Sequence, residues 1–498
     1  MKPSDNQNTQ AASLLDEQTG LPAAFLQRME GMLGERYGDF LRSFSLGERY
    51  HGLRVNPLKL SAPDFLQRHG ALFHLSPVPW APTGFYYAED DRPGKSVLHE
   101  AGLYYIQEPS AMSAAEALDI PEDLPDDFRV LDLCAAPGGK TTQIAGKMGG
   151  KGLLAANEII PSRAAILSQN IERLGIPNAL VLNETPARLA ERYPCAFDRI
   201  LVDAPCSGEG MYRKNDAAVT EWSEENVSRC AARQDEILNE AAKMLKPGGR
   251  LVYSTCTFAP AEDEGSACRF LAAHPEFSLA DTGLSGYFAA GQARFAETPV
   301  PGLEKTVRVW PHEVHGEGHF VTAFVKSADA PDLSDSFPSP QPGSHAVLNK
   351  QQQALFDAFC KETLSPRGQA ALETGTLALF GEELYRLPAV TLPYDRLKVV
   401  RSGMHLGSFR KNRFEPAHAL ALALPSLPGL SAEDFVSAAE ISMEDAQRYT
   451  RGEALPQSAP KGWLPVMLIE NGGRYPLGWC KSDGRMLKNH YPKGLRRL

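Results

Sequence analysis

The sequence predicts an α/β fold built on a mostly parallel, doubly wound sheet. Apolar runs typical of buried strands recur within residues 102–326, and helical stretches separate the earlier runs. A Pro-Gly-Gly turn at residues 137–139 also joins one of these strands directly to a helix. Repeated strand–helix units of this kind form parallel sheets with helices on both faces.

Six apolar runs supply the predicted strands. They lie at residues 130–133, 152–157, 179–182, 199–202, 250–254 and 320–325. The helix after the second strand should begin with Pro161 in its first turn and end at Gly175, the usual asymmetry of helix ends. The helix before the fifth strand should stop at residues 246–249, which read Lys-Pro-Gly-Gly.

Changes in composition divide the chain into further parts. A chain of 498 residues is too long for one core, and we expect about two to four domains. The predicted parts are a disordered N-terminus (1–18), an N-terminal α+β domain (19–101) that opens with helix, the sheet domain (102–326), a Pro- and Ser-rich linker (327–344), an intermediate α+β domain (345–405) and a C-terminal α+β or β-barrel region (406–498).

Several classes of protein are disfavoured. No apolar run reaches the ~18 residues that a membrane span needs, and residues 1–18 lack a signal-peptide core. The eight cysteines include no Cys-x-x-Cys pair, which argues against a disulfide framework and a zinc site. We therefore expect a cytoplasmic protein with free thiols, no metal and no membrane association, and we expect it to be a monomer.

The net charge of −10 is unusual for a protein that binds nucleic acid. Basic residues nevertheless gather in two places, and they could contact phosphates there or simply form a solvated surface. The two groups are Arg401, Arg410, Lys411 and Arg413, and then Lys481, Arg485, Lys488, Lys493, Arg496 and Arg497.

The segment of residues 129–141 is predicted to form a nucleotide-binding corner, because a strand, a glycine turn and a helix N-terminus follow one another. Gly138 and Gly139 allow the backbone to approach a ligand closely. A phosphate-binding P-loop is disfavoured, since its first glycine would fall on Cys134.

Two later strands end in cysteine-containing segments, which bring Cys206 and Cys256 to the predicted ligand-binding edge. Two thiols beside a cofactor corner suggest covalent catalysis. The alternative, a small buried core residue, fits the other cysteines better. These are Cys134, Cys195, Cys230, Cys268, Cys360 and Cys480.

These segments resemble the signature motifs of the RNA cytosine-5 methyltransferases, the Sun/Nop2 family. The motifs are Cys-Ala-Ala-Pro-Gly-Gly-Lys at 134–140, Asp-Ala-Pro-Cys-Ser-Gly at 203–208 and Ser-Thr-Cys at 254–256. The resemblance covers about residues 20–326, and residues 487–493 further resemble bacterial members that modify ribosomal RNA. It implies a class I, Rossmann-like methyltransferase fold, S-adenosylmethionine as methyl donor, small-subunit ribosomal RNA as substrate and a PUA-like RNA-binding domain at 406–498.

The resemblance also implies roles for single residues. Cys256 would be the nucleophile and Cys206 would assist product release, although other cytosine methyltransferases use the Pro-Cys thiol as nucleophile. Asp203 would bind the amidine edge of cytosine, unless it only caps a helix, and Lys140 would orient the base. The predicted cofactor-binding residues are Cys134, Ala135, Ala136, Pro137, Gly138, Gly139, Lys140, Glu158, Asn183 and Asp203.

Glu158 and Asn183 follow the second and third strands. An acid at the end of the second strand can accept hydrogen bonds from both ribose hydroxyls, as in dinucleotide sites. The alternative is that Glu158 is only an acidic residue near the N-terminus of the next helix. Asn183 would touch the adenine edge.

Two other functions remain open from the sequence. One is a transfer-RNA cytosine-5 methyltransferase, and the other is a catalytically silent RNA-binding assembly factor that retains the fold. The intact pair of Cys206 and Cys256 argues against the silent alternative. The Ala-Pro-Cys sequence at 204–206 argues against methylation of an exocyclic amine.

Overall fold

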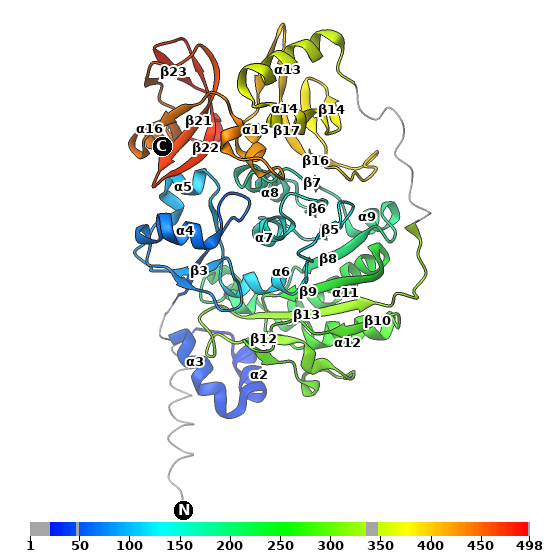
Figure 1. Cartoon of the computed structure of the whole chain (residues 1–498). Coiled ribbons are helices and arrows are strands. Elements are labelled where there is room, and N and C mark those ends of the chain that lie inside the picture. Colours follow the sequence, from blue (N-terminus) through cyan, green and yellow to red (C-terminus); the bar gives the residue numbers. More distant parts are fainter. Residues whose placement is uncertain (1–19, 46–48, 335–346, 497–498) are drawn as a thin grey trace, which may run out of the picture.

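The computed structural model describes residues 20–45, 49–334 and 347–496, whose arrangement Figure 1 shows. The predicted disordered N-terminus (1–18), residues 335–344 of the predicted linker and Arg497 lie outside the described residues. Within the described part of the chain, no helix has the length and apolar character needed to cross a membrane.

A ten-stranded mixed sheet forms the centre of the molecule and confirms the predicted α/β class. The strand order is β11-β12-β13-β9-β8-β5-β6-β7-β16, with β10 paired to β13. Five neighbouring strands, in the order β9, β8, β5, β6 and β7, run parallel to one another. β13 pairs antiparallel to β9. Their bounds are β5 Arg129–Asp132, β6 Leu153–Asn157, β7 Ala179–Leu182, β8 Phe197–Asp203, β9 Leu245–Thr255, β10 Phe277–Ala280, β11 Ala289–Ala290, β12 Val307–Val309, β13 His319–Lys326 and β16 Val399–Ser402.

Helices cover both faces of this sheet. Alternate residues of a strand face opposite layers, so Val130 of β5 packs among α6, α7 and α8, while Leu131 packs among α9, α11 and α12. The helices of this part are α6 Ser113–Glu116, α7 Gly139–Met148, α8 Pro161–Arg173, α9 Pro186–Arg192, α10 Asp216–Thr220, α11 Glu224–Met244 and α12 Glu264–Ala273. The parallel strands therefore end at one shared edge, where the turns that follow them meet.

Within the described residues, the N-terminal part contains four α-helices and a small sheet. Helices α2 (Ala23–Leu33) and α3 (Tyr37–Ser45) replace the single predicted helical stretch, and they pack on Tyr212, Phe258 and Trp310 of the central part. The four-stranded sheet has the order β2-β3-β1-β4. Its elements are β1 His51–Val55, α4 Ala62–His69, β2 Ser76–Pro77, β3 Gly84–Tyr87, α5 Val97–Glu100 and β4 Tyr104–Ile106.

The C-terminal part contains a four-stranded sheet and a five-stranded sheet. The predicted boundary between residues 405 and 406 falls inside β17, because this strand pairs with both β15 and β18. β16 leaves this region and pairs with β7 at the edge of the central sheet. The elements are α13 Lys350–Thr363, α14 Pro366–Glu373, β14 Leu377–Phe380, β15 Glu383–Arg386, β17 Met404–Arg410, β18 Arg413–Pro416, α15 His418–Ala423, β19 Ala439–Ile441, α16 Met443–Thr450, β20 Leu455–Pro456, β21 Gly462–Glu470, β22 Gly473–Ser482 and β23 Met486–Asn489.

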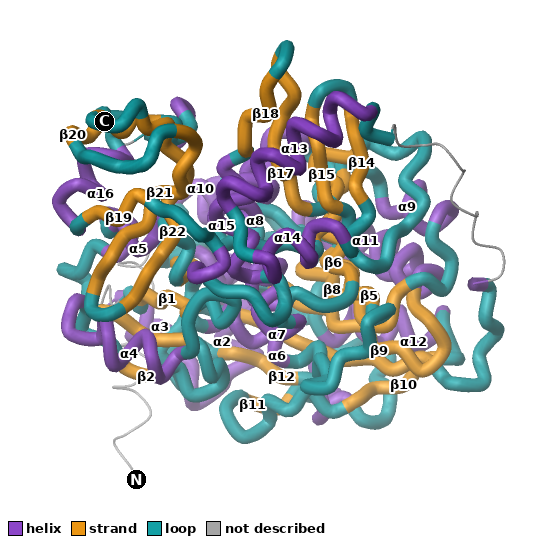
Figure 2. Tube along the Cα trace, turned by 45° about the horizontal axis from the view of Figure 1, so that its top comes forward, coloured by secondary structure: helices purple, strands orange, loops and turns teal. Residues whose placement is uncertain are grey.

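The five-stranded sheet (β19-β21-β22-β23-β20) packs against the N-terminal sheet and α5, as Figure 2 shows. His69 Nε2 lies 2.8 Å from the hydroxyl of Tyr475, and the Tyr491 hydroxyl donates to Glu100 Oε2 at 2.8 Å. The N-terminal sheet and the five-stranded C-terminal sheet therefore share one core.

Candidate active site

Two thiols meet at the edge of the central sheet where the parallel strands end. The Sγ atoms of Cys206 and Cys256 are 3.3 Å apart, and both side chains are half-buried. The hydrogen bond with Cys256 and burial raise the pKa of the Cys206 thiol. The Cys206 thiol is therefore harder to ionise than an exposed thiol.

Asp203, the last residue of β8, is held beside this pair. Lys140 Nζ donates to its Oδ2 at 2.7 Å, and the Ser254 hydroxyl donates to its Oδ1 at 2.8 Å. Burial alone would raise the pKa of Asp203, but the Lys140 ammonium group and His319 hold it below its usual range. The Asp203 side chain is still 31% exposed, so a ligand can reach the charged carboxylate.

His319 begins β13 and completes this group, although the sequence motifs gave no indication of it. Its Nε2 lies 3.9 Å from Asp203 Oδ1 and has no hydrogen-bond partner among the described residues. Burial and the nearby Lys140 ammonium lower the pKa of His319 to about 4. A neutral, buried imidazole therefore borders the carboxylate at neutral pH.

Glu262, in the turn before α12, connects the loops that carry the two thiols. Its Oε2 accepts from the Ser207 backbone N–H at 2.9 Å, and its Oε1 accepts from the Ser207 hydroxyl. The same hydroxyl lies 2.8 Å from Oγ1 of Thr257. Since Ser207 and Thr257 directly follow Cys206 and Cys256, this chain of contacts fixes the two thiols relative to each other.

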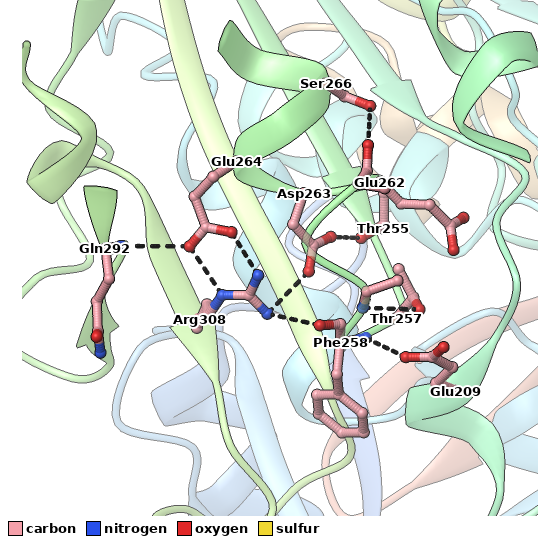
Figure 3. A network of polar contacts seen from close by, with 12 residues as sticks. Glu209, Thr255, Thr257, Phe258, Glu262, Asp263, Glu264, Ser266, Gln292 and Arg308 are labelled. Carbon is pink, nitrogen blue, oxygen red and sulfur yellow. Dashed lines mark hydrogen bonds and ion pairs between the residues drawn. The ribbon is translucent and has the colours of Figure 1, made fainter. Parts of the chain in front are cut away.

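A second buried network, drawn in Figure 3, holds the residues next to Cys256 in place. Arg308 of β12 pairs with Asp263 at 2.9 Å and also contacts Glu264. Asp263 accepts from the Thr255 hydroxyl at 2.6 Å, and the Phe258 carbonyl accepts from Arg308 at 3.1 Å. Thr255 and Phe258 flank Cys256, so the network holds both ends of the short Cys256 segment.

The predicted cofactor corner has the expected geometry. Gly138 precedes α7 with a φ of 112°, a conformation that favours glycine. The backbone of the turn is held in place because the Ala135 N–H donates to the Asn157 carbonyl, the Ala136 carbonyl accepts from Arg163 and the Pro137 carbonyl accepts from Asn170. Cys134 and Gly139 complete the turn, while Lys140 points to Asp203.

The acids near this corner suit a cofactor with ribose hydroxyls and a positive charge. Glu158 lies at the end of β6, where it accepts from the Ile160 N–H at 2.9 Å and pairs with Arg163 at 3.4 Å. The Asn183 amide donates to the Glu158 carbonyl at 2.7 Å, which links the ends of β6 and β7. Asp132 Oδ1 has no hydrogen-bond partner within the described chain, and burial raises the pKa of this carboxyl to about 7. These acceptors fit S-adenosylmethionine.

Some residues of the site have weak signals in the sequence. Glu262, Asp263 and Glu264 form an acidic run just after the Thr-Cys motif, which could have drawn attention to them. Arg54 lacks any such signal, yet it reaches from β1 to the Gly139 carbonyl at 3.1 Å and to Thr142 Oγ1 at 2.6 Å. The N-terminal sheet therefore supports the cofactor corner directly.

Relatives in three organisms match this chain along almost its full length. The ribosomal RNA small subunit methyltransferase F of Erwinia tasmaniensis is 34% identical over 494 residues, which cover 96% of this chain and 97% of the relative. The chain belongs to this methyltransferase family. The proteins of the same name in Cronobacter sakazakii and Escherichia coli are 33% and 32% identical, and each match covers 96% of both chains.

Family models assign the same identity to separate parts of the chain. Residues 121–325 match the 16S rRNA methyltransferase RsmB/F model, and 21–109 match the N-terminal domain of RsmF. Residues 358–424 match the first C-terminal domain of RsmF, and 436–497 match its PUA domain. The resemblance to the Sun/Nop2 methyltransferases and the RNA-binding character of the C-terminus are therefore confirmed.

A solved structure confirms the fold of the central part. A methyltransferase homologue from Pyrococcus horikoshii is 29% identical, with a TM-score of 0.56, and it covers 63% of this chain and 99% of its own length. The N-terminal and central parts together account for about that share of the chain.

Proposed function

We propose that this chain transfers a methyl group from S-adenosylmethionine to carbon 5 of a cytosine in 16S ribosomal RNA. The observation that carries the proposal is the Cys206–Cys256 pair beside the partly buried Asp203–Lys140 ion pair. The names of the relatives favour ribosomal over transfer RNA. We also propose that the protein acts as a monomer in the cytoplasm.

The nucleophile in this proposal is Cys256. Carbon 5 of cytosine is a poor nucleophile until a thiolate adds to carbon 6, which forms a carbon–sulfur bond and moves an electron pair toward carbon 5. S-adenosylmethionine supplies the electrophilic methyl group that carbon 5 then takes. In this proposal Cys206 keeps its proton, in line with its raised pKa, and its S–H lies 3.3 Å from the sulfur of Cys256.

Product release requires a base to remove the proton at carbon 5, after which the bond between Cys256 and carbon 6 breaks. Cys206 is placed to assist this step, because its S–H can stabilise the departing thiolate of Cys256. A half-buried site strengthens such a bond relative to water. We therefore assign Cys206 to release and not to attack.

Asp203 has the position required to hold the cytosine ring. Negative charge moves into the ring when the thiolate adds, so the ring nitrogen takes up a proton. The Asp203 carboxylate at the amidine edge then accepts hydrogen bonds from this N–H and from the exocyclic amine. Lys140 and Ser254 fix the orientation of this carboxyl group before the base enters. The cytosine must leave its stack to reach the site.

The C-terminal part offers a basic and aromatic surface for the RNA. Lys481 Nζ lies 5.5 Å from the ring centre of Trp463, and the His490 ring packs 4.4 Å from the same indole. Lys481, Arg485 and Lys488 are exposed on or near β22 and β23. Such a surface supports phosphate contact despite the acidic net charge of the whole chain.

Methyl transfer to purified small-subunit RNA tests the proposal. Labelled S-adenosylmethionine should transfer its methyl group to 16S ribosomal RNA, and bisulfite sequencing of the product should locate a 5-methylcytosine. A strain that lacks the protein should lose the same bisulfite-resistant position. Label on transfer RNA alone, or at an exocyclic amine, would contradict the proposal.

A further inference from the structure

Three aromatic side chains pack together where the N-terminal sheet meets the segment before β13. The rings of Tyr50 and His315 are stacked, with centroids 4.5 Å apart and planes at 10° to each other. Tyr86 of β3 packs its ring edge-on at 6.0 Å from His315 and 6.4 Å from Tyr50. His315 is exposed, whereas Tyr50 and Tyr86 are half-buried, so His315 presents the accessible ring.

His315 stands on a segment that is fixed by buried polar contacts. In the next residues, Glu317 pairs with Arg213 at 2.8 Å, and its backbone N–H donates to Glu108 Oε1 at 3.0 Å. The Ser110 hydroxyl donates to the Glu317 carbonyl at 2.9 Å. The stacked ring is therefore presented by a rigid support, and little ordering is needed when a ligand binds it.

The same segment leads straight into the active site. His315 and His319 are four residues apart, so their Cα atoms are separated by at most roughly 14 Å. His319 borders Asp203, as described above. Lys214, which follows Cys206 in the same connecting loop, donates to the Tyr50 carbonyl at 3.3 Å. The aromatic group is thus connected to the segment that carries His319 and to the loop that carries Cys206.

We propose that the exposed ring of His315, supported by Tyr50 and Tyr86, is a stacking site for a base that neighbours the target cytosine in the RNA strand. This inference rests on the proposed function, because it requires an RNA substrate whose cytosine reaches Asp203. RNA-modifying sites receive unstacked bases, and an aromatic face replaces the neighbour that such a base has lost.

Local charge favours a nucleotide over an apolar peptide as the occupant. Arg213 and Lys214 lie close to this group, where they contact Glu317 at 2.8 and 3.7 Å. Arg49, directly before Tyr50, adds an exposed cation. Stacking on a flat ring next to an exposed cation fits a base with its phosphate.

A cycle of paired changes in protein and RNA tests this site. Bisulfite sequencing first locates the cytosine that the wild-type protein methylates, in free ribosomal RNA or in the assembled subunit. Abasic nucleotides are then placed one at a time beside that cytosine. For the wild type, one abasic position should lower kcat/KM by about 5- to 150-fold, the range expected for loss of one base–aromatic stack.

The His315→Ala variant should show the same loss with intact RNA and little further loss with the abasic RNA. His315→Phe should retain most of the activity, because it keeps a flat ring. Calorimetry should show unchanged affinity for S-adenosylmethionine in both variants. His405 stacks on Tyr385 at 4.7 Å in the separate β14–β18 sheet, and His405→Ala should leave the abasic effect intact.

The possible outcomes separate the two proposals. A wild-type protein that methylates no RNA would overturn the proposed function. If the wild type is active, the losses in kcat/KM caused by His315→Ala and by the abasic nucleotides can be compared. Losses that multiply would show that the two changes act independently. The stacking site would then be overturned, and the aromatic group would serve only to pack the N-terminal part against the central part.

Discussion

The carboxyl group of Glu262 receives two hydrogen bonds from Ser207, one from its backbone N–H at 2.9 Å and one from its hydroxyl. Gln234 Nε2 adds a third bond at 2.8 Å. Burial raises the pKa of this carboxyl to about 7, despite the bonds from Ser207 and Gln234 that lower it. The group that fixes the Cys206 loop is therefore protonated much more readily than an ordinary glutamate.

This relationship predicts a pH-dependent difference between the wild type and Glu262→Gln. Glutamine resembles the protonated acid: its carbonyl can accept from the Ser207 and Gln234 N–H groups, and its amide can donate to the Ser207 hydroxyl. Because the folded-state pKa lies above the ordinary 4.5, the stability that Glu262 contributes is complete below that pH and is lost as pH rises through about 7.

Thermal unfolding at about pH 5 and about pH 8 measures this difference. The glutamine variant should gain stability relative to the wild type at the higher pH, by roughly 3 kcal/mol for a shift of this size. Glu262→Ala should be destabilised at both pH values, since it leaves the Ser207 N–H unpaired. A difference between wild type and Glu262→Gln that is constant with pH would show that this carboxyl does not titrate in the folded protein.

The second prediction concerns the charge of Asp203. Asp203→Asn removes the charged partner of the half-buried Lys140 ammonium group and presents an N–H donor to the cytosine edge. Turnover should fall by about 100-fold or more, while cofactor affinity should change much less. Ser254→Ala removes only one bond to the carboxylate and should cost about 1 kcal/mol, or roughly fivefold. Near-normal turnover of Asp203→Asn would reduce Asp203 to a structural role.

The third prediction assigns Glu158 to the ribose of the cofactor. Glu158→Ala should lower the affinity for S-adenosylmethionine at least tenfold, because two charge-assisted bonds are worth roughly 1.5–3 kcal/mol each. Glu158→Gln keeps one acceptor and should lie between the alanine variant and the wild type. Calorimetry on the purified proteins measures both. An unchanged affinity in Glu158→Ala would show that Glu158 does not bind the ribose and that its role is limited to its contacts with Ile160 and Arg163.

The local elements of the central sheet follow from the sequence. β7 occupies residues 179–182 as predicted, and α8 begins at Pro161 because proline suits the first turn of a helix. The motif residues Cys134, Cys206 and Cys256 each follow a parallel strand, so their meeting at one edge follows from the doubly wound topology. The fold and the meeting of the two thiols could therefore be predicted from the sequence.

Contacts between distant segments were not predictable in the same way. Glu262 meets Ser207 from 55 positions away, and Arg54 reaches Gly139 across 85 positions, with no periodic pattern that marks either pair. β16 joins the central sheet at β7, which the composition of residues 345–405 does not reveal. Such pairs depend on how whole elements pack together, and local propensity does not determine that packing.

The fourth prediction tests the basic surface of the C-terminal part. Deleting residues 482–498 would also remove β23 and the buried side chains of Leu487 and Tyr491, so charge removal is the sharper test. The variant Lys481→Gln, Arg485→Gln, Lys488→Gln should bind RNA more weakly, and the salt dependence of binding should become shallower by about 0.7–0.9 per lost phosphate contact. Cofactor affinity should not change.

A matched variant removes three exposed cations from α11, namely Arg229, Arg233 and Lys243. It should leave the salt slope of RNA binding close to that of the wild type. If both triple variants reduce the slope equally, the RNA is attracted by total charge, and the C-terminal surface has no special part in binding.

The central claim is that Cys256 attacks the cytosine and Cys206, 3.3 Å away, assists its release. The most direct measurement is a denaturing gel of the purified Cys206→Ala and Cys256→Ala variants after incubation with the RNA substrate and S-adenosylmethionine. Cys206→Ala should accumulate a covalent protein–RNA adduct, whereas Cys256→Ala should form no adduct and transfer no methyl group. An adduct in Cys256→Ala together with none in Cys206→Ala would contradict the account and reverse the two roles.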